Sequence, residues 1–196
     1  MSRRVYLVRH GETDWSIDRR HTGRTDLPLN AEGRRRATDL RARLAKLTDV
    51  DRALVLVSPL ARAVETCELA GLGGRAERLD DLVEWDYGEF EGTRTSDLRV
   101  ADPAWSIWTA AITQGETLDD VAARADRVVT RVGEASEPVV FLFAHAHLLR
   151  ILAARWCGLP ARVGEHLTLL PASISMLGYE RDVRVIDHWN TAAFPS

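Results

Sequence analysis

The chain has 196 residues, of which 45% are hydrophobic and 28% are charged, and its net charge is −3. This composition excludes a disordered chain, and the length suits a single domain over residues 1–196 that buries a core without disulfides. The slightly acidic balance gives no reason to expect nucleic-acid or membrane binding. All basic residues except Lys46 are arginines, so each arginine has to be interpreted from its position.

Cysteine content and apolar runs bear on the compartment. Cys67 and Cys157 lie in apolar stretches, and we expect both to be small buried residues in a reducing compartment rather than disulfide partners. Residues 1–11 contain too few apolar side chains for a signal peptide. The longest apolar run, residues 139–144, is too short to cross a bilayer. These features predict a cytoplasmic location.

Three short apolar runs have the uninterrupted, β-branched character of strands that are covered on both faces. They are residues 5–8, 53–57 and 139–143. Amphipathic helical patterns lie between them. Residues 37–47 carry apolar side chains at spacings of three and four, so we expect the arginine run 34–36 to be a solvated helix face.

Local signals predict where two of the helices begin. Ser58 followed by Pro59 predicts a helix with Ser58 as its N-cap and Pro59 at its first position. Thr117 with Asp120 forms a variant of the capping box ahead of a helix predicted over residues 121–132.

The last third of the chain changes character. Ile174 and Met176 alternate with serines, which is the period of a half-exposed strand, and Gly178 then offers a turn. Strands that alternate with helices indicate an α/β fold. We predict a single-domain, three-layer, doubly wound and mostly parallel sheet with helices on both faces, and the terminal strands allow an antiparallel edge.

The predicted strands end in residues that carry chemistry. In open parallel sheets, ligands bind beyond the carboxyl ends of the strands. The first strand runs into Arg9 and His10, the third runs into His145, and the helix after the second strand carries Arg62 on its first turn. We therefore expect two histidines and two arginines to converge at one rim of the sheet.

These residues belong to motifs that resemble the Arg-His-Gly signature of the histidine phosphatase superfamily, which has the phosphoglycerate-mutase-like fold. The resemblance extends in the family's order over residues 7–13, 21–29, 58–63, 84–88, 115–117 and 143–145. Within the superfamily, the chain is most similar to the branch of acid phosphatases and sedoheptulose-bisphosphatase. The resemblance implies a phosphomonoester hydrolase of the histidine acid phosphatase type, without a metal or another cofactor.

The chemistry of phosphoryl transfer gives each residue type a role. A phosphomonoester is close to dianionic, so its oxygens must be neutralised, a task that suits the guanidinium groups of Arg9 and Arg62. His10 is expected to attack phosphorus in line and to form a phosphohistidine. A protonated His145 would add a third positive donor, and Glu84 would protonate the leaving oxygen.

The resemblance also points to residues that bind the phosphate. They are Arg9, Ser16, Thr22, Gly23, Arg62, Tyr87 and Ala146. Ser16 stands where mutases commonly carry asparagine. Ala146 stands where the family usually has glycine, so a positive φ there would cost energy. The glycine after His10 is expected to let backbone approach the anion. His147 is expected to support the residues that contact the phosphate, or to be structural, rather than to contact the phosphate itself.

Three alternatives stay open at this point. A metal enzyme would use the ligand-like spacing of His145 and His147, whose rings share a face if both lie on a strand. A non-catalytic protein would bind a phosphorylated ligand without turning it over. Within the enzyme class, the competitor is a cofactor-dependent phosphoglycerate mutase.

The segment between Glu84 and Gly115 bears on that last choice. Its acids and bases are Asp86, Glu89, Glu91, Asp97, Asp102, Arg94 and Arg99. A short, acidic cover suits a phosphoglycerate carboxylate poorly and admits water to the phosphohistidine. We therefore expect the partner to be a small phosphorylated metabolite such as a sugar phosphate, and the sequence allows a homo-oligomer. Trp105 and Trp108, three apart on an expected helix, would form an apolar wall or pack in the core.

Overall fold

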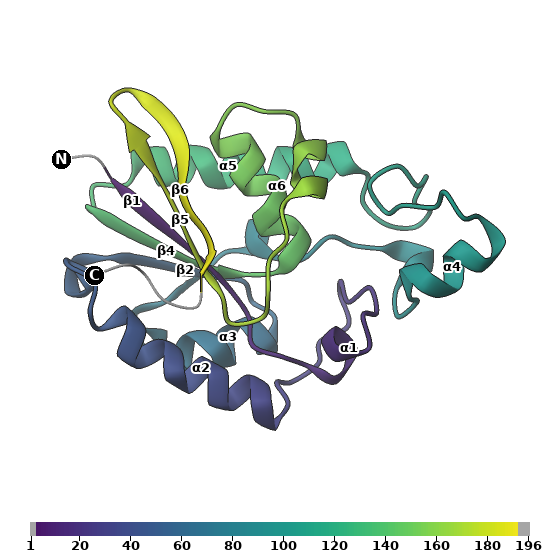
Figure 1. Ribbon diagram of the computed structural model, residues 1–196. Coiled ribbons are helices and arrows are strands. Elements are labelled where there is room, and N and C mark those ends of the chain that lie inside the picture. Colours follow the sequence, from purple (N-terminus) through teal and green to yellow (C-terminus); the bar gives the residue numbers. More distant parts are fainter. Residues whose placement is uncertain (1–2, 192–196) are drawn as a thin grey trace.

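The computed structural model describes residues 3–191 and contains a six-stranded mixed sheet between helices (Figure 1). In sheet order the strands are β3 (Glu77–Arg78), β2 (Leu54–Val57), β4 (Val139–Ala144), β1 (Arg4–Arg9), β5 (Ile174–Glu180) and β6 (Val183–Thr191). The first four run parallel to one another, whereas β5 is antiparallel to both β1 and β6. The predicted parallel sheet with an antiparallel edge is confirmed.

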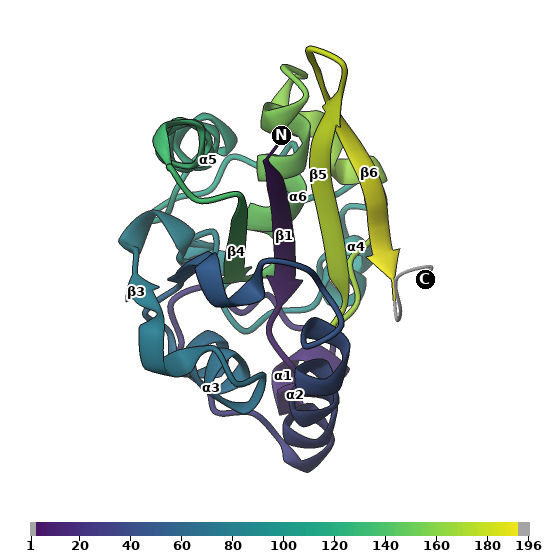
Figure 2. The ribbon, with the colours of Figure 1, turned by 90° about the vertical axis from the view of Figure 1, so that its left-hand side faces the viewer.

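Helices form the layers on the two faces of the sheet. The α-helices of the described residues are α1 (Asp14–Ile17), α2 (Ala31–Leu44), α3 (Ala61–Leu69), α4 (Thr95–Ala101), α5 (Leu118–Glu134) and α6 (Ala146–Trp156). Short 3₁₀ turns occupy Val50–Arg52, Gly73–Arg75, Asp80–Leu82, Gly88–Phe90 and Ala161–His166. The pair α2 and α3 covers one face of the sheet and the pair α5 and α6 covers the other (Figure 2). The predicted three-layer arrangement is confirmed.

The parallel strands β1, β2 and β4 are buried on both faces, as their uninterrupted apolar runs predict. In β1, Val5 and Leu7 pack into the core under α5 and α6, whereas Tyr6 and Val8 pack into the core over α2 and α3. All four side chains are at most 2% exposed. Because these positions contribute to the two cores, the central strands are a firm support for the residues that follow their carboxyl ends.

One predicted helix start is confirmed and the other is wrong. Helix α5 begins at Leu118 with Thr117 as N-cap, and the side chain of Asp120 completes the capping box. Helix α3 begins at Ala61, two residues after Pro59, because its first amide donates to a carboxylate from a distant loop. The N–H of Ala61 donates to Asp26 Oδ1 over 2.8 Å.

The terminal hairpin departs from the prediction in two ways. Gly178 lies inside β5, and the chain reverses at Arg181, which has a φ of 56°. Strand β5 is also mostly buried rather than half-exposed. Ser175 is fully buried, and its hydroxyl accepts a hydrogen bond from the backbone N–H of Asn190 in β6 over 2.9 Å. A hydroxyl that is satisfied in this way can face the interior, so the Ile–Ser alternation does not mark a solvent face.

Trp105 and Trp108 lie in consecutive turns rather than in the expected helix. The ring of Trp108 packs against Trp85 at a centroid distance of 5.8 Å, and that of Trp105 packs against Phe90 at 5.2 Å. Aromatic packing of this kind positions the segment without helical hydrogen bonds.

Cys67 and Cys157 are both free cysteines; Cys67 is buried and Cys157 is partly buried. The arginines of the 34–36 run lie on α2 with Arg34 and Arg35 exposed, as predicted. Within residues 3–191, no helix has both the length and the apolar character that a membrane span requires.

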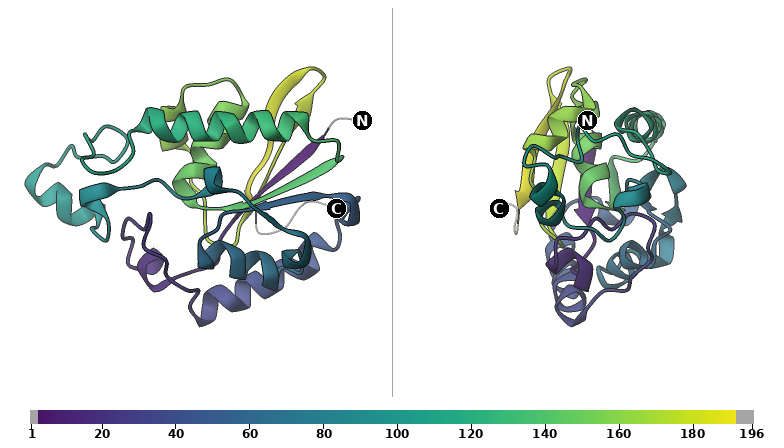
Figure 3. Two further views of the ribbon diagram at one scale, coloured as in Figure 1. Left: turned by 180° about the vertical axis from the view of Figure 1, so that it is seen from behind. Right: turned by 90° about the vertical axis from the view of Figure 1, so that its right-hand side faces the viewer.

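Two excursions extend beyond the carboxyl ends of the parallel strands. One carries α1 and the other carries α4, and seen from behind they lie on the same side of the sheet (Figure 3). A β-bridge between Arg20 and Arg94 links them. The N–H of His21 donates to Thr93 O over 2.8 Å, and the N–H of Gly92 donates to His21 O over 2.8 Å. The two excursions therefore form one connected cover over this end of the sheet.

Candidate active site

The strand ends bring the predicted histidines and arginines together. Arg9 in β1 is in parallel register with Ala144 in β4, so the next residues, His10 and His145, lie side by side. Their ring centroids are 5.2 Å apart. Arg62, on the first turn of α3, places its Nε 3.2 Å from Nδ1 of His145. The convergence expected from topology is therefore present.

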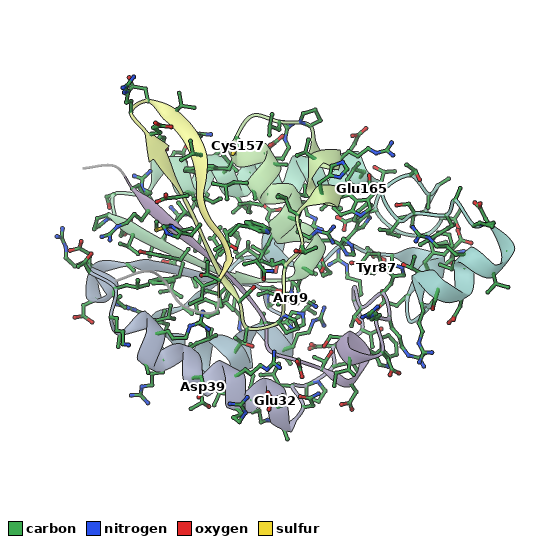
Figure 4. All side chains as sticks on the ribbon, in the orientation of Figure 1. Arg9, Glu32, Asp39, Tyr87, Cys157 and Glu165 are labelled. Carbon is green, nitrogen blue, oxygen red and sulfur yellow. The ribbon has the colours of Figure 1, made fainter. Side chains whose placement is uncertain are left out.

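A cavity of about 590 Å³ opens above this rim. Its wall includes most of the residues that the motifs identify, namely Arg9, His10, Ser16, Thr22, Glu84, Tyr87, Ala146 and His147. Figure 4 shows Arg9 and Tyr87 on the side of the sheet where α1 and α4 lie. The volume is in the range of pockets that bind small molecules.

His10 has one ring nitrogen fixed and the other available. Its Nδ1 lies 2.7 Å from the carbonyl oxygen of Gly11, which can only accept, so Nδ1 carries the proton and Nε2 keeps its lone pair. Burial, and next the positive charges of Arg62 and Arg9, lower the pKa of His10 well below the usual 6.5. At neutral pH the ring is thus uncharged.

Packing requires the glycine after His10. A Cβ at Gly11 would lie 2.6 Å from the carbonyl oxygen of Gly33 at the start of α2. A Cβ at Gly33 would in turn lie 2.2 Å from the carbonyl oxygen of Glu12. This close contact between two backbones is a sufficient reason for glycine at position 11, and the approach of the backbone to an anion stays a prediction.

Arg62 is fully buried, and all three of its guanidinium nitrogens bond to the protein. Its Nη1 donates to Thr25 O over 2.9 Å, and its Nη2 donates to the carbonyls of Thr22 at 3.1 Å and Gly23 at 2.9 Å. One N–H of Nη1 has no protein acceptor among the described residues. Arg62 therefore ties the first loop to the histidine pair, and Thr22 and Gly23 are its acceptors.

His145 is neutral, contrary to the expected protonated ring. A guanidinium only donates, so Nδ1 of His145 accepts from Arg62, and Nε2 carries the proton. That Nε2 lies 2.7 Å from the hydroxyl oxygen of Ser58 and donates to it. Burial, and next the charge of Arg62, lower the pKa of His145 well below 6.5. In this arrangement His145 holds Arg62 in place and supplies no positive charge.

Of the two arginines that the motifs identify, Arg9 and Arg62, it is Arg9 that lines the cavity. Its Nη1 donates to the carbonyl oxygen of Leu169, while its buried Nε has no hydrogen-bond partner among residues 3–191. Burial lowers the pKa of Arg9 to about 10, so the side chain remains cationic at neutral pH. A buried, unsatisfied cationic donor is costly, and an oxyanion in the cavity is the partner that would satisfy it.

Glu84 is held by three backbone amides. Its Oε1 accepts from the N–H groups of Trp85 at 3.0 Å and Leu148 at 2.9 Å, and its Oε2 accepts from His147 at 3.1 Å. Two of these amides belong to the first turn of α6, so Glu84 caps that helix from a distant loop. Oε1 has both lone pairs engaged, and Oε2 keeps one position for a proton.

Two residues in which the chain departs from the family pattern can now be placed. The hydroxyl of Ser16 donates to Thr13 O over 2.8 Å and accepts from the N–H of Thr13 over 2.9 Å. Ser16 therefore completes the capping box of α1, and its proton is engaged there, although it lines the cavity. Ala146 is the first residue of α6 and does not have a positive φ, so the substitution for glycine carries no backbone strain.

Tyr87 and His147 form a hydrogen-bonded pair in the cavity wall. The phenol oxygen lies 2.5 Å from Nδ1 of His147. Burial raises the pKa of Tyr87 well above 10.0 and lowers that of His147 well below 6.5, so both are neutral. His147 thus presents a neutral ring to the cavity.

The geometry disfavours the metal alternative. His147 lies in α6 rather than on a strand with His145, and both nitrogens of His145 are already engaged. In the part of the chain that the structure describes, no group of three or more His, Cys, Asp or Glu side chains is arranged to hold a metal ion.

Sequence reasoning missed several basic residues of the cavity. Besides Arg9, four arginines line it: Arg19, Arg20, Arg99 and Arg150. Arg150 stands over the ring of Trp108 at 4.7 Å and follows His147 by three positions on α6. Its helical spacing from the Ala146–His147 pair was the signal that could have identified it.

The expected acidic cover is wrong. None of Asp86, Glu89, Glu91, Asp97 and Asp102 lines the cavity. Glu91 accepts from the amides of Gly23 and Thr25, and Glu89 accepts from Thr113. These carboxylates fix loops from outside, while Arg99 of the same segment faces the cavity. The mouth is therefore basic.

Comparison with known proteins supports the resemblance. Residues 5–192 match the histidine phosphatase superfamily, branch 1. An acid phosphatase of Mycobacterium tuberculosis is 39% identical over 183 residues, covering 92% of this chain and 89% of that protein. A sedoheptulose 1,7-bisphosphatase of Saccharomyces cerevisiae is 32% identical, covering 80% and 68%. A probable phosphoglycerate mutase of Proteus mirabilis is 31% identical, covering 94% and 89%.

The fold comparison agrees. The structure solved for the product of an open reading frame of Mycobacterium tuberculosis has a TM-score of 0.90 and 36% sequence identity. The match covers 96% of this chain and 97% of that one. Together with the paired strand ends that carry Arg9, His10 and His145, these matches establish that the chain is a member of the histidine phosphatase superfamily.

Proposed function

We propose that this protein is a phosphatase that hydrolyses small phosphomonoesters through a phosphohistidine on His10. The observation that carries the proposal is the state of the His10 ring. Its Nδ1 proton is donated to Gly11 O over 2.7 Å, which leaves the Nε2 lone pair as the nucleophile, beside a cationic Arg9 whose Nε has no partner among the described residues.

In the first step, Nε2 of His10 attacks phosphorus while the bond from phosphorus to the ester oxygen breaks. The leaving oxygen takes a proton from Oε2 of Glu84, the one carboxylate oxygen with a free position. In the second step, a water molecule gives a proton back to Glu84 and attacks the phosphohistidine. Inorganic phosphate leaves and His10 regains its lone pair.

The positive charge of the site supports both steps. Arg9 would donate from Nε to an equatorial oxygen, and the remaining N–H of Arg62 would reach a second one. Because His145 is neutral, the charge comes from arginines alone. Arginines keep their charge over the working pH range, so stabilisation of the transition state does not depend on a histidine proton.

Two observations bear on whether the protein is a phosphatase or a mutase. The acid phosphatase is the relative at 39% identity, which favours hydrolysis. The basic mouth of the cavity removes the argument that an acidic cover repels phosphoglycerate. A mutase that keeps its phosphoryl group from water is therefore the second candidate, and the fate of that group separates the two.

The test is a panel of sugar phosphates and 3-phosphoglycerate, followed both by release of inorganic phosphate and by phosphorus NMR of the organic products. We expect phosphate release with little 2-phosphoglycerate, and no dependence on added metal. Efficient conversion of 3-phosphoglycerate to 2-phosphoglycerate with little free phosphate from any compound would favour the mutase. Binding of these compounds without any turnover would identify a phospho-ligand binder.

A further inference from the structure

The motif block at residues 115–117 has no role in the chemistry proposed for the cavity. It belongs to the resemblance, yet none of these three described residues lines the cavity. The side chain of Glu116 instead forms an ion pair with Arg124 of α5, which donates from Nε to Oε1 over 2.6 Å and from Nη2 to Oε2 over 2.8 Å. Such a two-point contact fixes both the place and the orientation of the guanidinium.

The remaining N–H groups of Arg124 bond to the backbone that leads to Glu84. Its Nη1 donates to the carbonyl oxygens of Asp81 over 2.9 Å and Val83 over 2.8 Å, and its Nη2 also donates to that of Glu84 over 3.4 Å. All five N–H groups of the guanidinium are therefore engaged, two by Glu116 and three by this backbone. Because Arg124 is only 8% exposed, water cannot readily replace these acceptors.

Glu116 bonds to the two residues that follow Glu84. Its carboxylate accepts from the N–H of Asp86 over 3.0 Å, and its own N–H donates to Asp86 O over 2.9 Å. Its carbonyl oxygen accepts from Nε1 of Trp85 over 2.7 Å. Gly115 permits this close approach, because a Cβ there would lie 2.5 Å from Asp86 O. The ion pair therefore holds the chain on both sides of Glu84.

The carboxylate of Glu84 depends on where this segment lies. The side chain is 4% exposed, and two of its three hydrogen bonds come from α6, from the amides of His147 over 3.1 Å and Leu148 over 2.9 Å. Helix α6 is distant from the segment in sequence, so the position of the segment decides whether the carboxylate reaches both amides. A displacement of about 1 Å in a reacting group can cost about a hundredfold in rate.

Glu116 is charged, and Arg124 is its buried cationic partner. Burial tends to raise the pKa of Glu116, but the hydrogen bonds from Arg124 and from the Asp86 amide lower it below the usual 4.5. Arg24 is a second cation near Glu116, but its Nη2 lies 3.8 Å from Oε2 and its side chain is 49% exposed. An exposed contact of that length stabilises little, so it does not replace the contact with Arg124.

We propose that Arg124 and Glu116 are positioning residues for the general acid: their ion pair fixes the backbone around Glu84 so that its carboxyl group meets the leaving oxygen. Neither residue lines the cavity, so the pair acts through Glu84 and not on the substrate. This inference rests on the proposed function, because it requires Glu84 to donate the proton. Loss of the pair should therefore have the same kinetic signature as loss of the acid.

The experiment compares kcat and KM for fructose 6-phosphate, whose leaving oxygen needs a proton, and for p-nitrophenyl phosphate, whose leaving group needs little protonation. Arg124→Lys keeps the charge but cannot reproduce the two-point contact, and Glu116→Gln keeps the shape but removes the charge. Asp126→Asn is the matched control. Asp126 also lies on α5 and accepts a two-point contact, from Arg155 over 2.8 Å and 2.9 Å, and neither residue lines the cavity.

We expect both variants to lose roughly tenfold to a hundredfold in kcat with fructose 6-phosphate, but less than about threefold with p-nitrophenyl phosphate. KM should change less than about threefold, because neither residue reaches the substrate. Added to Glu84→Gln, the change Arg124→Lys should cause little further loss, since the acid is already absent.

Asp126→Asn should have the kinetics of the wild type with both compounds. If Arg124→Lys does not fold, Glu116→Gln carries the same comparison. Equal losses on both compounds, or full additivity with Glu84→Gln, would show a purely structural role and overturn the proposal. Wild-type kinetics of the folded variants would overturn it as well.

Hydrogen exchange separates failure of this proposal from failure of the proposed function, because it needs no turnover. The amide of Leu148, which donates to Glu84, should exchange faster in Arg124→Lys than in the wild type, relative to the amide of Ile151 in the same helix. If neither compound is hydrolysed but this difference is present, the pair positions Glu84 and the hydrolytic function falls. If the Leu148 amide exchanges as in the wild type, the positioning role falls whether or not the protein is an enzyme.

Discussion

The Nε of Arg62 donates a hydrogen bond to Nδ1 of His145 over 3.2 Å, and neither side chain is exposed to solvent. This contact determines the protonation state of the second histidine. It also joins the first loop, through the carbonyls of Thr22 and Gly23, to the ends of the central strands. The geometry of the site therefore depends on one buried guanidinium.

Arg62→Ala should damage both stability and activity. The substitution leaves three backbone carbonyls and a buried ring nitrogen without their donor, so we expect the free energy of unfolding to fall by about 3–5 kcal/mol. Activity with p-nitrophenyl phosphate should fall at least about a hundredfold. Urea denaturation and steady-state rates measure the two effects. Arg162→Ala, at an exposed position, is the control, and wild-type stability of Arg62→Ala would contradict the described role.

His10 should remain neutral well below pH 6.5. Its pKa is lowered by burial and by Arg62 and Arg9, so the nucleophile is present above that lowered pKa and is lost only as pH falls through it. We expect nitrogen NMR of labelled histidine to show the Nδ1-protonated tautomer of His10 at about pH 6. Assignment uses the His10→Gln variant. A doubly protonated ring at that pH would contradict the hydrogen-bond assignment.

The buried neutral histidines should make the fold sensitive to mild acid. Burial lowers the pKa of His21 to about 4, so below about 6.5 the unfolded chain takes up a proton that the folded chain does not. Stability is therefore full above pH 6.5 and falls as pH drops towards 4. His21 contributes up to about 2 kcal/mol of this loss at about pH 5.

Urea denaturation of His21→Gln at neutral and mildly acidic pH tests this contribution. Although the variant loses the contact with Thr95, its stability should depend less on pH than that of the wild type. His166→Gln, at an exposed position, should keep the wild-type dependence. Identical pH dependence of all three proteins would show that His21 does not titrate as its burial implies.

Glu84→Gln should affect poor leaving groups more than good ones. An amide cannot donate a proton to the ester oxygen, so kcat for a sugar phosphate should fall by about 10²–10⁴. With p-nitrophenyl phosphate, whose leaving group needs little protonation, the loss should be much smaller. Equal losses on both substrates would show that the carboxylate only caps α6 through His147 and Leu148.

The fold and the centre of the site could be predicted from local patterns. Uninterrupted apolar runs predicted the central parallel strands, because a strand that is buried on both faces needs apolar side chains on both. The residues that follow parallel strands lie at one edge of the sheet. Arg9, His10, Arg62 and His145 are together for that reason. The capping box of Thr117 and Asp120 predicted the start of α5 correctly, because this motif uses only residues within one turn of the chain.

The wrong predictions concern features that depend on contacts between residues far apart in the sequence. Asp26 supplies the carboxylate at the start of α3, so the Ser58–Pro59 signal was overridden. Whether a charged side chain between Glu84 and Gly115 faces the cavity depends on turns that the sequence pattern does not reveal. Arg19 and Arg99 carried no sequence signal, since nearly every basic residue of this chain is an arginine.

Acid–base stability of the trapped phosphoprotein tests the central claim most directly. The enzyme is mixed with radiolabelled substrate, denatured within the first turnovers, and digested for peptide mapping. We predict an acid-labile, alkali-stable phosphoryl group on His10 that appears in wild type and in the control His166→Ala, and is absent from His10→Ala, which remains folded. An acid-stable adduct on a serine, or unchanged turnover by His10→Ala, would contradict the account.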